Sequence, residues 1–382
     1  MVYILISILS DAIQNMMFGR GTLNTGVTPS KNKNVIKEMN KINTNELILI
    51  LNPNSQGGNT GKNWISTYSK VKEFLPKNHR IIFTKKTNDG IFDTRKLLRN
   101  GYKNIVAIGG DGTINEIANG FFNLQPQNRN IENLERFSFD DKLKPINPNG
   151  VLYIIPSGSR NVLARSFGLK HQGVQALKRI KQMDRRKMDA ILAVITDKDS
   201  PSLTHKRIIL NAAEIGIGAE IIDRSKRVRR KIKSRFVSTI ASIVATLPAY
   251  NSNECDIVID GDKRISSNMT MAVVANGRFL GGGFKAAPRA KFSDGLLDII
   301  ILKNSGSFKM LDKLIELKGT STYKFEEDIL YYQASEVKFL PKERNVTVTV
   351  SVDGEPIGKL PAIFKSYHNA LTIKTETSSS RI

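Results

Sequence analysis

The sequence is poor in the residues that build disulfide scaffolds and zinc sites. Its 382 residues include a single cysteine, Cys255, and four histidines. One cysteine cannot form an internal bridge, and this set leaves little for a Cys/His zinc site. The disulfide-rich secreted class is therefore excluded.

Long apolar runs are also missing. The apolar run over residues 1–9 has about half the length that a transmembrane helix needs. No Lys or Arg precedes it and no small-residue cleavage site follows it, so a secretory signal is a poor interpretation. We expect residues 1–45 to form a flexible leader and linker, with an interfacial membrane anchor as the alternative.

Acidic residues are scarce beside basic ones. Lys and Arg number 58 against 35 Asp and Glu, which gives a formal net charge of +23. Such an excess attracts polyanions or an anionic membrane surface. Trp64 is the only Trp, and no aromatic-interleaved platform is present, so we expect no nucleic-acid partner.

The densest basic segment covers residues 224–235, and an apolar stretch over residues 236–247 continues it. This pattern is typical of an amphipathic surface that docks on anionic lipid headgroups. A solvated helix that keeps the protein soluble is the alternative. We expect a cytoplasmic protein that associates peripherally with the membrane, and a homo-oligomer is possible.

At 40% hydrophobic residues, the chain has enough apolar material for the cores of two domains of ordinary size. Strand and helix patterns alternate through the first half, which favours a Rossmann-like α/β domain with a parallel sheet. The expected strands are residues 47–51, 80–84, 104–108 and 151–155, and the expected helices are residues 62–74 and 90–98.

The second half has the alternating patterns of an antiparallel β-sandwich, most strictly over residues 345–353. Shorter strands are expected at residues 256–259, 270–275, 296–302 and 371–374. We therefore predict an α/β domain over residues 46–187 with an insertion at 123–149, a β-sandwich domain over 188–376 and a tail over 377–382. The active site is expected in the cleft between the two domains.

The sharpest motif is IGGDGTINEIANG over residues 108–120, where an apolar strand enters paired glycines and then a helix. Glycines let backbone N–H groups approach a polyphosphate, and the helix N-terminus favours the same anion. Asp111 would stand where a carboxylate can hold Mg²⁺ against nucleotide phosphates. The alternative is a tight turn with a helix cap.

Two further turns end strands in the same way. The segment NPNSQGG over residues 52–58 follows the first strand, and PSGSRN over residues 156–161 follows the fourth. The first is not a P-loop, because that pattern needs a glycine at Gln56 and a hydroxyl at Asn63. Together the three turns predict a ligand crevice at one edge of one sheet.

The β-rich half adds two segments. Asp294 lies in a Ser-Asp-Gly turn within residues 280–297, and VSVDGEP over residues 350–356 places Asp353 and Glu355 on either side of a glycine. Without further context, Asp353-Gly354 is also a hairpin turn signal.

At these motifs the sequence resembles the diacylglycerol kinase catalytic-domain family, which includes sphingosine, ceramide and bacterial lipid kinases. The resemblance covers about residues 47–375 and rests on NPNSQGG, GGDGTINE, PSGSRN, GGGFKAAPRAKFSDGLLD and VDGEP. The GGDGT motif alone is shared with NAD kinases and phosphofructokinases. The SDGLLD and VDGEP elements, in this order, favour the lipid-kinase branch.

The resemblance implies roles for individual residues. Glu355 would be the general base, and Asp111 and Asp189 would belong to an acidic network linked to Mg²⁺. Asp294, with the backbone carbonyls of Lys291 and Leu296, would hold a structural Mg²⁺. The residues implied in ATP binding are Asn52, Pro53, Asn54, Ser55, Gln56, Thr84, Gly110, Asp111, Gly112, Thr113, Ile114, Asn115, Glu116 and Ser159.

Two positions depart from the family pattern PxGTxND, which reads PSGSRNV here. Ser159 replaces Thr, and Val162 stands where an acidic residue often joins the metal network. The prediction is an ATP- and Mg²⁺-dependent lipid kinase acting on a diacylglycerol-like or sphingoid hydroxyl. The alternatives are an NAD kinase-like or soluble polyol kinase, and a non-catalytic nucleotide-regulated protein that binds anionic membranes or nucleic acid.

Overall fold

The computed structural model describes residues 44–124, 127–128, 137–140, 142–221, 250, 252–304, 328–343 and 346–376. The basic segment 224–235, its apolar continuation, the tail 377–382 and residues 1–43 of the predicted leader lie outside these residues, as does part of the predicted insertion. Among the described residues, no helix has the length and apolar character that a membrane span requires.

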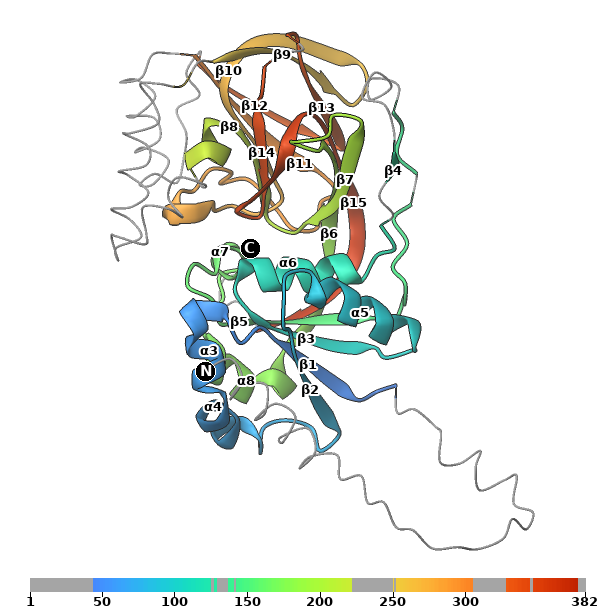
Figure 1. Ribbon diagram of the computed structural model, residues 1–382, viewed down its shortest axis with the longest axis vertical. Helices are drawn as coiled ribbons and strands as arrows, with labels where there is room; N and C mark the ends of the chain where they lie inside the picture. The colour runs from blue at the N-terminus through green and yellow to red at the C-terminus, as the bar shows by residue number, and fades with distance from the viewer. Residues whose placement is uncertain are drawn as a thin grey trace, which may run out of the picture. The chain divides into compact units, whose positions relative to one another are not determined.

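The first half contains strands that pair in parallel in the order β5-β3-β1-β2. Helices lie between them along the chain, as the sequence predicted (Figure 1). The strands are β1 (Leu47–Leu51), β2 (His79–Phe83), β3 (Asn104–Gly109) and β5 (Val151–Pro156); the helices are α3 (Asn59–Lys62), α4 (Trp64–Val71), α5 (Asp89–Arg99), α6 (Asp111–Gly120), α7 (Val162–Ser166) and α8 (Gly173–Lys178).

The strands β1, β3 and β5 of this sheet are buried on both faces, which explains why they are nearly continuous apolar runs. In β1, Ile48 and Ile50 pack in one core cluster with residues of α5 and α6. Leu47, Leu49 and Leu51 face the other way and pack in a second cluster with residues of α4 and α8. A strand covered by helices on both sides needs apolar residues at every position.

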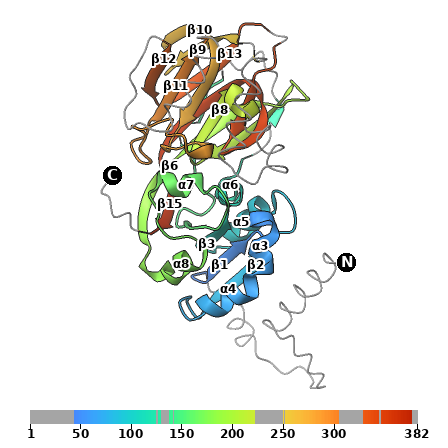
Figure 2. The ribbon, with the colours of Figure 1, turned by 90° about the vertical axis from the view of Figure 1, so that its left-hand side faces the viewer.

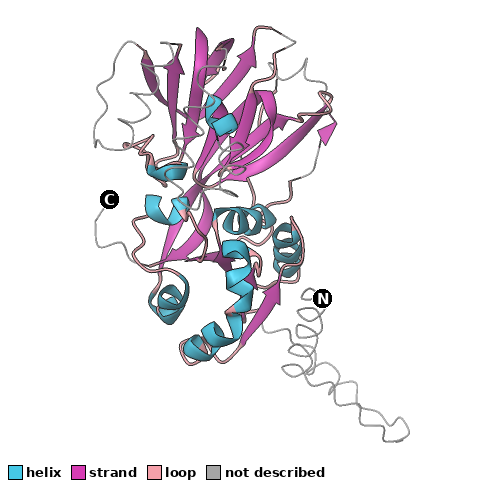
Figure 3. Ribbon diagram, turned by 60° about the vertical axis from the view of Figure 1, so that its left-hand side comes forward, coloured by secondary structure: helices cyan, strands magenta, loops and turns pink. Residues whose placement is uncertain are grey.

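The second half is dominated by antiparallel strands, and Figure 3 shows strands filling this part while the helices gather around the parallel sheet. Its strands are β6 (Asp184–Thr196), β7 (Leu203–Ile209), β8 (Ala212–Gly216), β9 (Asn253–Ile259), β10 (Lys263–Ala275), β11 (Leu297–Lys303), β12 (Ile329–Ala334), β13 (Glu336–Pro341), β14 (Thr349–Val352) and β15 (Glu355–Thr375), with β4 (Gln127–Asn128) pairing to β7.

Some predicted bounds were wrong. The expected strand 345–353 is shorter, because β14 gains its partners only from Thr349, which pairs with β15, and Val350, which pairs with β8. The expected helix 62–74 is divided at Asn63 into α3 and α4 and ends at Val71. The alternating pattern of apolar and polar residues over 345–353 is therefore longer than the strand that forms there.

Two long strands join the two halves of the sheet (Figure 2). β15 pairs antiparallel with β14, β13 and β6, and near its end Ile373 pairs in parallel with Leu152 of β5. β6 accompanies β15 from Asp184, opposite Thr375, to Thr196, opposite Lys359. β6 runs without a break through the domain boundary predicted after residue 187.

Helix α6 is also attached to the β-rich half through two asparagines one turn apart. Asn115 donates from Nδ2 to the carbonyl of Ile208 at 2.8 Å. Asn119, which is 2% exposed, donates to the same carbonyl at 3.0 Å, and its Oδ1 accepts from the Ile208 N–H at 2.8 Å. These bonds hold the GGDGT helix against β7.

We expect Asn119→Ala to lower the free energy of unfolding by about 2–4 kcal/mol, because it leaves the buried N–H of Ile208 without its partner. Urea denaturation followed by circular dichroism measures this loss. Asn123→Ala is the matched control, since Asn123 is exposed and accepts one bond from Arg99. Equal stability of the two variants would contradict this role of Asn119.

Candidate active site

The three turns predicted to share one edge of the sheet are in contact there. After β1, Asn52 donates from Nδ2 to Oγ1 of Thr113 in α6 at 3.3 Å. Gln56 donates from Nε2 to the carbonyl of Ser157, beyond β5, at 3.1 Å. The N–H of Ser157 in turn donates to the carbonyl of Gly109 at 2.7 Å.

The turns after β3 and β5 approach so closely that only glycine fits at their crossing. A Cβ added to Gly158 would lie 2.2 Å from Cα of Gly110. Asn161, in the left-handed region with φ of 50°, fixes the second turn by accepting a bond from the Gly158 N–H at 2.9 Å. The glycines of the two motifs therefore form one backbone surface.

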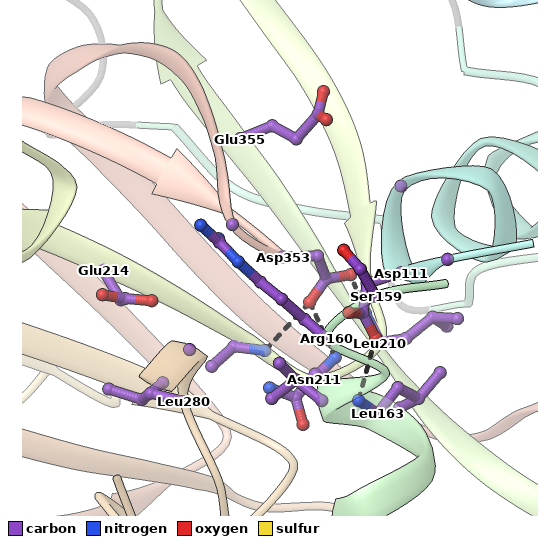
Figure 4. Close-up of a pocket in the computed structure, with 16 residues that line it drawn as sticks. Asp111, Ser159, Arg160, Leu163, Leu210, Asn211, Glu214, Leu280, Asp353 and Glu355 are labelled. Carbon is purple, nitrogen blue, oxygen red and sulfur yellow. Dashed lines mark hydrogen bonds between the residues drawn. The ribbon is translucent and has the colours of Figure 1, made fainter. Parts of the chain in front are cut away.

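A cavity of about 220 Å³ opens beside this surface (Figure 4). It lies between the two glycine turns and the β-rich half, as expected for the cleft. Its walls come from the GGDGT turn, the turn and helix after β5, the β7–β8 junction, the Leu280 loop and the VDGEP hairpin. The lining residues are Gly110, Asp111, Gly112, Ser159, Arg160, Val162, Leu163, Leu210, Asn211, Ala212, Glu214, Leu280, Gly281, Asp353, Gly354 and Glu355.

Asp353 ties these walls together. Its Oδ1 accepts from the N–H groups of Asn211 and Ala212, both at 3.0 Å. Its Oδ2 accepts from the Leu210 N–H at 3.0 Å and from Nδ2 of Asn115 in α6 at 2.6 Å. Burial raises the pKa of Asp353 to about 6, and these four donors oppose the rise.

The turn between β14 and β15 is a two-residue hairpin, so the hairpin interpretation of Asp353-Gly354 is also correct. Asp353 and Gly354 have φ of 47° and 83°, and Val352 pairs with Glu355 across them. Positive φ at both central residues is the type I′ requirement that Asp-Gly satisfies. The hairpin places Glu355 at the cavity, two residues after the half-buried Asp353.

Glu355 faces the N-terminus of α6. A Cβ added to Gly112 would lie 3.2 Å from Oε1 of Glu355, so glycine leaves room for the carboxylate. Glu355 is exposed, while Asp111 is half-buried and accepts a bond on Oδ1 from the Leu163 N–H at 3.1 Å. Within the described residues, the other carboxylate oxygen of Asp111 has no hydrogen-bond partner.

Other predicted nucleotide-site residues do not line the cavity. Ile114 is fully buried in the core beneath α6. Thr84 is 5% exposed beyond β2, and its N–H donates to the carbonyl of Leu51 at 3.0 Å. Glu116 turns to α5, where Oε1 accepts from the Asn88 N–H at 3.0 Å, and burial raises the pKa of this carboxyl.

Two charged residues of the cavity were not predicted. Glu214 of β8 is 9% exposed, and burial raises its pKa to about 8; the positive charge of Arg160 opposes the rise and the negative charge of Asp353 adds to it. Arg160 was part of the quoted PSGSRN motif but was given no role. An acid inside the apolar strand segment AAEIG was the available signal for Glu214.

Comparison with known proteins identifies the family of this chain. The family described as "Diacylglycerol kinase catalytic domain" matches residues 46–193, and "YegS C-terminal NAD kinase beta sandwich-like domain" matches residues 211–375. The chain belongs to the diacylglycerol kinase catalytic-domain family. It is an enzyme, a kinase that transfers phosphate to an alcohol.

Individual relatives are distant. "Probable lipid kinase YegS-like" of Chromohalobacter salexigens is 26% identical over 70% of this chain and 74% of its own length. "Diacylglycerol kinase" of Bacillus subtilis is 22% identical over 70% of this chain and 76% of its own. The crystal structure of a diacylglycerol kinase from Bacillus anthracis strain Sterne covers 88% of this chain and 98% of that one, with a TM-score of 0.60 and 20% identity. This likeness confirms the two-part fold with a β-rich C-terminal half.

In this kinase Asp189 lies outside the cavity wall. Its carboxylate is fully buried; Oδ1 accepts from the Asn369 N–H at 2.7 Å and lies 3.0 Å from Nδ1 of His368, and Oδ2 accepts from the Gly295 N–H at 2.6 Å. Burial raises the pKa of Asp189. These contacts give Asp189 a positioning role for the turn that carries Asp294, and its catalytic role stays a prediction.

The turn at Asp294 offers oxygen donors for a cation. Oδ1 accepts from the Leu296 N–H at 3.1 Å, and within the described residues Oδ2 has no hydrogen-bond partner. Oδ2 of the nearby Asp298 is buried without a partner; burial raises the pKa of Asp298 to about 6, and the charge of Asp294 adds to the rise. Carboxylate and carbonyl oxygens, including that of Lys291, are donors that fit Mg²⁺.

Within the described part of the chain, no group of three or more His, Cys, Asp and Glu side chains forms a metal cluster. A cation at Asp294 would therefore depend on backbone carbonyls and water.

We expect Asp353→Asn to lower the free energy of unfolding by about 2–4 kcal/mol and to reduce kcat, because the new NH₂ group must face two donors whichever way the amide turns. Urea denaturation measures the first effect and the kinase rate the second. Asp262→Asn is the matched control, because Asp262 is exposed in the turn after β9. Unchanged stability of Asp353→Asn would rule out the four-donor arrangement.

Proposed function

We propose that the protein is an ATP- and Mg²⁺-dependent lipid kinase that phosphorylates the hydroxyl of a diacylglycerol-like or sphingoid lipid. The observation that carries the proposal is the position of Glu355, a carboxylate at a cavity whose opposite wall is a glycine turn and the N-terminus of α6. This arrangement puts a proton acceptor beside a surface suited to phosphate.

The nucleotide would lie along the three turns of a Rossmann-like edge, with its phosphates on the backbone of Gly110 and Gly112. Neither glycine has a side chain to cover its backbone N–H group, and the helix dipole of α6 favours negative charge. Ser159 and Arg160 line the same wall and can donate to phosphate oxygens. The segment at residues 52–56 and Thr84 would border the nucleoside.

Asp111 would hold Mg²⁺ through its second carboxylate oxygen, which has no hydrogen-bond partner among the described residues. Asp294, with the carbonyls of Lys291 and Leu296, would hold a structural Mg²⁺. Bound beside the phosphates, Mg²⁺ supplies charge neutralisation of the transferred group. Val162 lines the cavity at the position of the usual acid, so Asp111 carries more of this task here.

Glu355 would act as the general base. Its carboxylate takes the proton of the lipid hydroxyl while the hydroxyl oxygen forms a bond to the γ-phosphorus of ATP. The bond from that phosphorus to the bridging oxygen breaks, and ADP leaves with the electron pair. Asp353 keeps the hairpin, and therefore Glu355, in place during this step.

A lipid substrate suggests that the enzyme works at a membrane surface. We propose that the net charge of +23 holds a cytoplasmic enzyme on an anionic membrane surface, with no nucleic-acid partner. The segment proposed for this contact, residues 224–235, lies outside the described residues. The division into domains at residues 46–187 and 188–376, and assembly as a homo-oligomer, stay part of the proposal.

Incubation with a total lipid extract and γ-labelled ATP is expected to put label into an organic-phase lipid, and removal of Mg²⁺ by EDTA is expected to stop the transfer. Thin-layer chromatography and mass spectrometry identify the product. NAD, glycerol and inositol tested in parallel cover the soluble acceptors. Label only in NAD or a polyol, or in no product at all, would refute the lipid-kinase proposal.

Glu355→Gln is expected to lower kcat by about 100- to 10,000-fold, because the amide cannot accept the hydroxyl proton. ATP affinity, measured by calorimetry, is expected to change little, since Glu355 is not a nucleotide ligand in this proposal. Glu343→Gln is the control, because Glu343 is exposed in the turn after β13. Loss of ATP affinity with a smaller change in kcat would assign Glu355 to nucleotide binding instead.

A further inference from the structure

Glu214 is a cavity residue that the proposed reaction does not use. It is 9% exposed, it lines the cavity, and among the described residues its carboxyl group has no hydrogen-bond partner. A buried polar group without a partner is costly, so such a group in a binding cavity points to a ligand atom that completes it.

The register of the sheet places Glu214 on an apolar surface. It pairs with Val273 of β10 and with Ser351 of β14, and paired residues point to the same face of a sheet. On this face, Ala212, Val273 and Leu280 belong to one buried apolar cluster. Glu214 therefore lies where the cavity meets apolar residues of this face, of which Ala212 and Leu280 line the cavity.

Within the described part of the chain, two charged side chains act on Glu214. Arg160 and Asp353 act on it electrostatically, with opposite effects. Tyr250, whose hydroxyl lies 2.9 Å from the place of a Cβ on Gly216, stays neutral because burial raises its pKa. The residues of β10 on this face are not titratable. Burial raises the pKa of Glu214 to about 8, so at neutral pH the group keeps its proton and can donate a hydrogen bond.

We propose that the carboxyl group of Glu214 donates a hydrogen bond to an uncharged oxygen of the acceptor lipid, an ester carbonyl or second hydroxyl beside the phosphorylated one, and so selects neutral glycerolipids over cationic long-chain amines. The inference rests on the proposed lipid-kinase function and decides between its two substrate classes.

The position of Arg160 is a second reason to expect a neutral glycerolipid rather than a cationic amine. Its Nη1 lies 3.9 Å from the places of a Cβ on Gly281 and on Gly354, so the guanidinium lies between the two sides of the cavity. An ammonium group bound near Glu214 would meet this positive charge and would gain no attraction from a protonated Glu214. A neutral oxygen meets no such repulsion.

The protonation of Glu214 sets the direction in which pH changes the KM for the lipid. Below about pH 8 the protonated carboxyl donates to the lipid oxygen; above it the carboxylate can only accept, and the bond is lost. The KM for a neutral glycerolipid is therefore expected to rise as the pH passes 8.

The experiment measures kcat and KM for 1,2-dioleoylglycerol and for sphingosine in mixed micelles from pH 6.5 to 9.5. Glu214→Leu removes the donor and is expected to raise KM for the glycerolipid about 2- to 10-fold at pH 7 with a smaller change in kcat. Glu214→Gln keeps an N–H donor at every pH, so it is expected to recover most of this loss and to flatten the alkaline rise.

Glu254→Leu and Glu254→Gln are the matched controls, because Glu254 lies on β9 outside the cavity wall and pairs with Lys342. For the unchanged protein we expect a kcat/KM for the glycerolipid more than about tenfold above that for sphingosine, because the ammonium would face Arg160. Thermal denaturation of every variant separates lost folding from lost recognition.

Three results would overturn the inference. In the first, sphingosine is the better substrate and Glu214→Gln abolishes its turnover, so that the ionised carboxylate binds the amine. In the second, Glu214→Leu and Glu214→Gln match the Glu254 variants in KM at every pH while dioleoylglycerol is phosphorylated, which leaves the lipid-kinase proposal intact. In the third, the unchanged protein phosphorylates no lipid, and both proposals fall.

Discussion

The carboxylate of Asp353 is the interaction on which the site depends. It accepts three backbone N–H groups from the β7–β8 junction and one side-chain amide from α6, so one residue joins the GGDGT helix, the wall of the cavity and the VDGEP hairpin. A carboxylate is suited to this because its two oxygens accept four bonds, which no neutral side chain of that size can do. Because these hydrogen bonds hold the hairpin, they also fix the position of Glu355.

The fold around Asp353 supplies the rigidity that the hydrogen bonds need. β15 starts at Glu355 and continues to Thr375, pairing on the way with β14, β13 and β6 before it meets β5 of the parallel sheet. The strand that carries the proposed base is therefore continuous with the sheet that carries the proposed phosphate-binding turns. A displacement between the two halves would have to bend this strand, which is held by partners along most of its length.

The sequence predicted the parallel sheet well because its strands β1, β3 and β5 lie between helical layers and are apolar almost throughout. It also predicted the convergence of the three turns, since the carboxyl ends of parallel strands meet at one edge. It could not predict which residues reach the cavity. Glu116 and Asn115 share a motif, yet one caps α5 and the other binds Asp353, because the helix turns them to different neighbours. Glu214 was missed because its partners lie on strands far along the chain.

The cavity contains acids whose surroundings differ, and the difference separates their roles. Glu355, the proposed base, is exposed at its rim, within reach of an incoming hydroxyl group. Asp353 is held by four donors that favour its anion. Glu214 is only 9% exposed and has no hydrogen-bond donor among the described residues, and burial on an apolar face favours its proton. In the proposed reaction, residues of one chemical type would thus accept a proton, fix a hairpin and donate a hydrogen bond within one site, because the sheet buries each to a different depth.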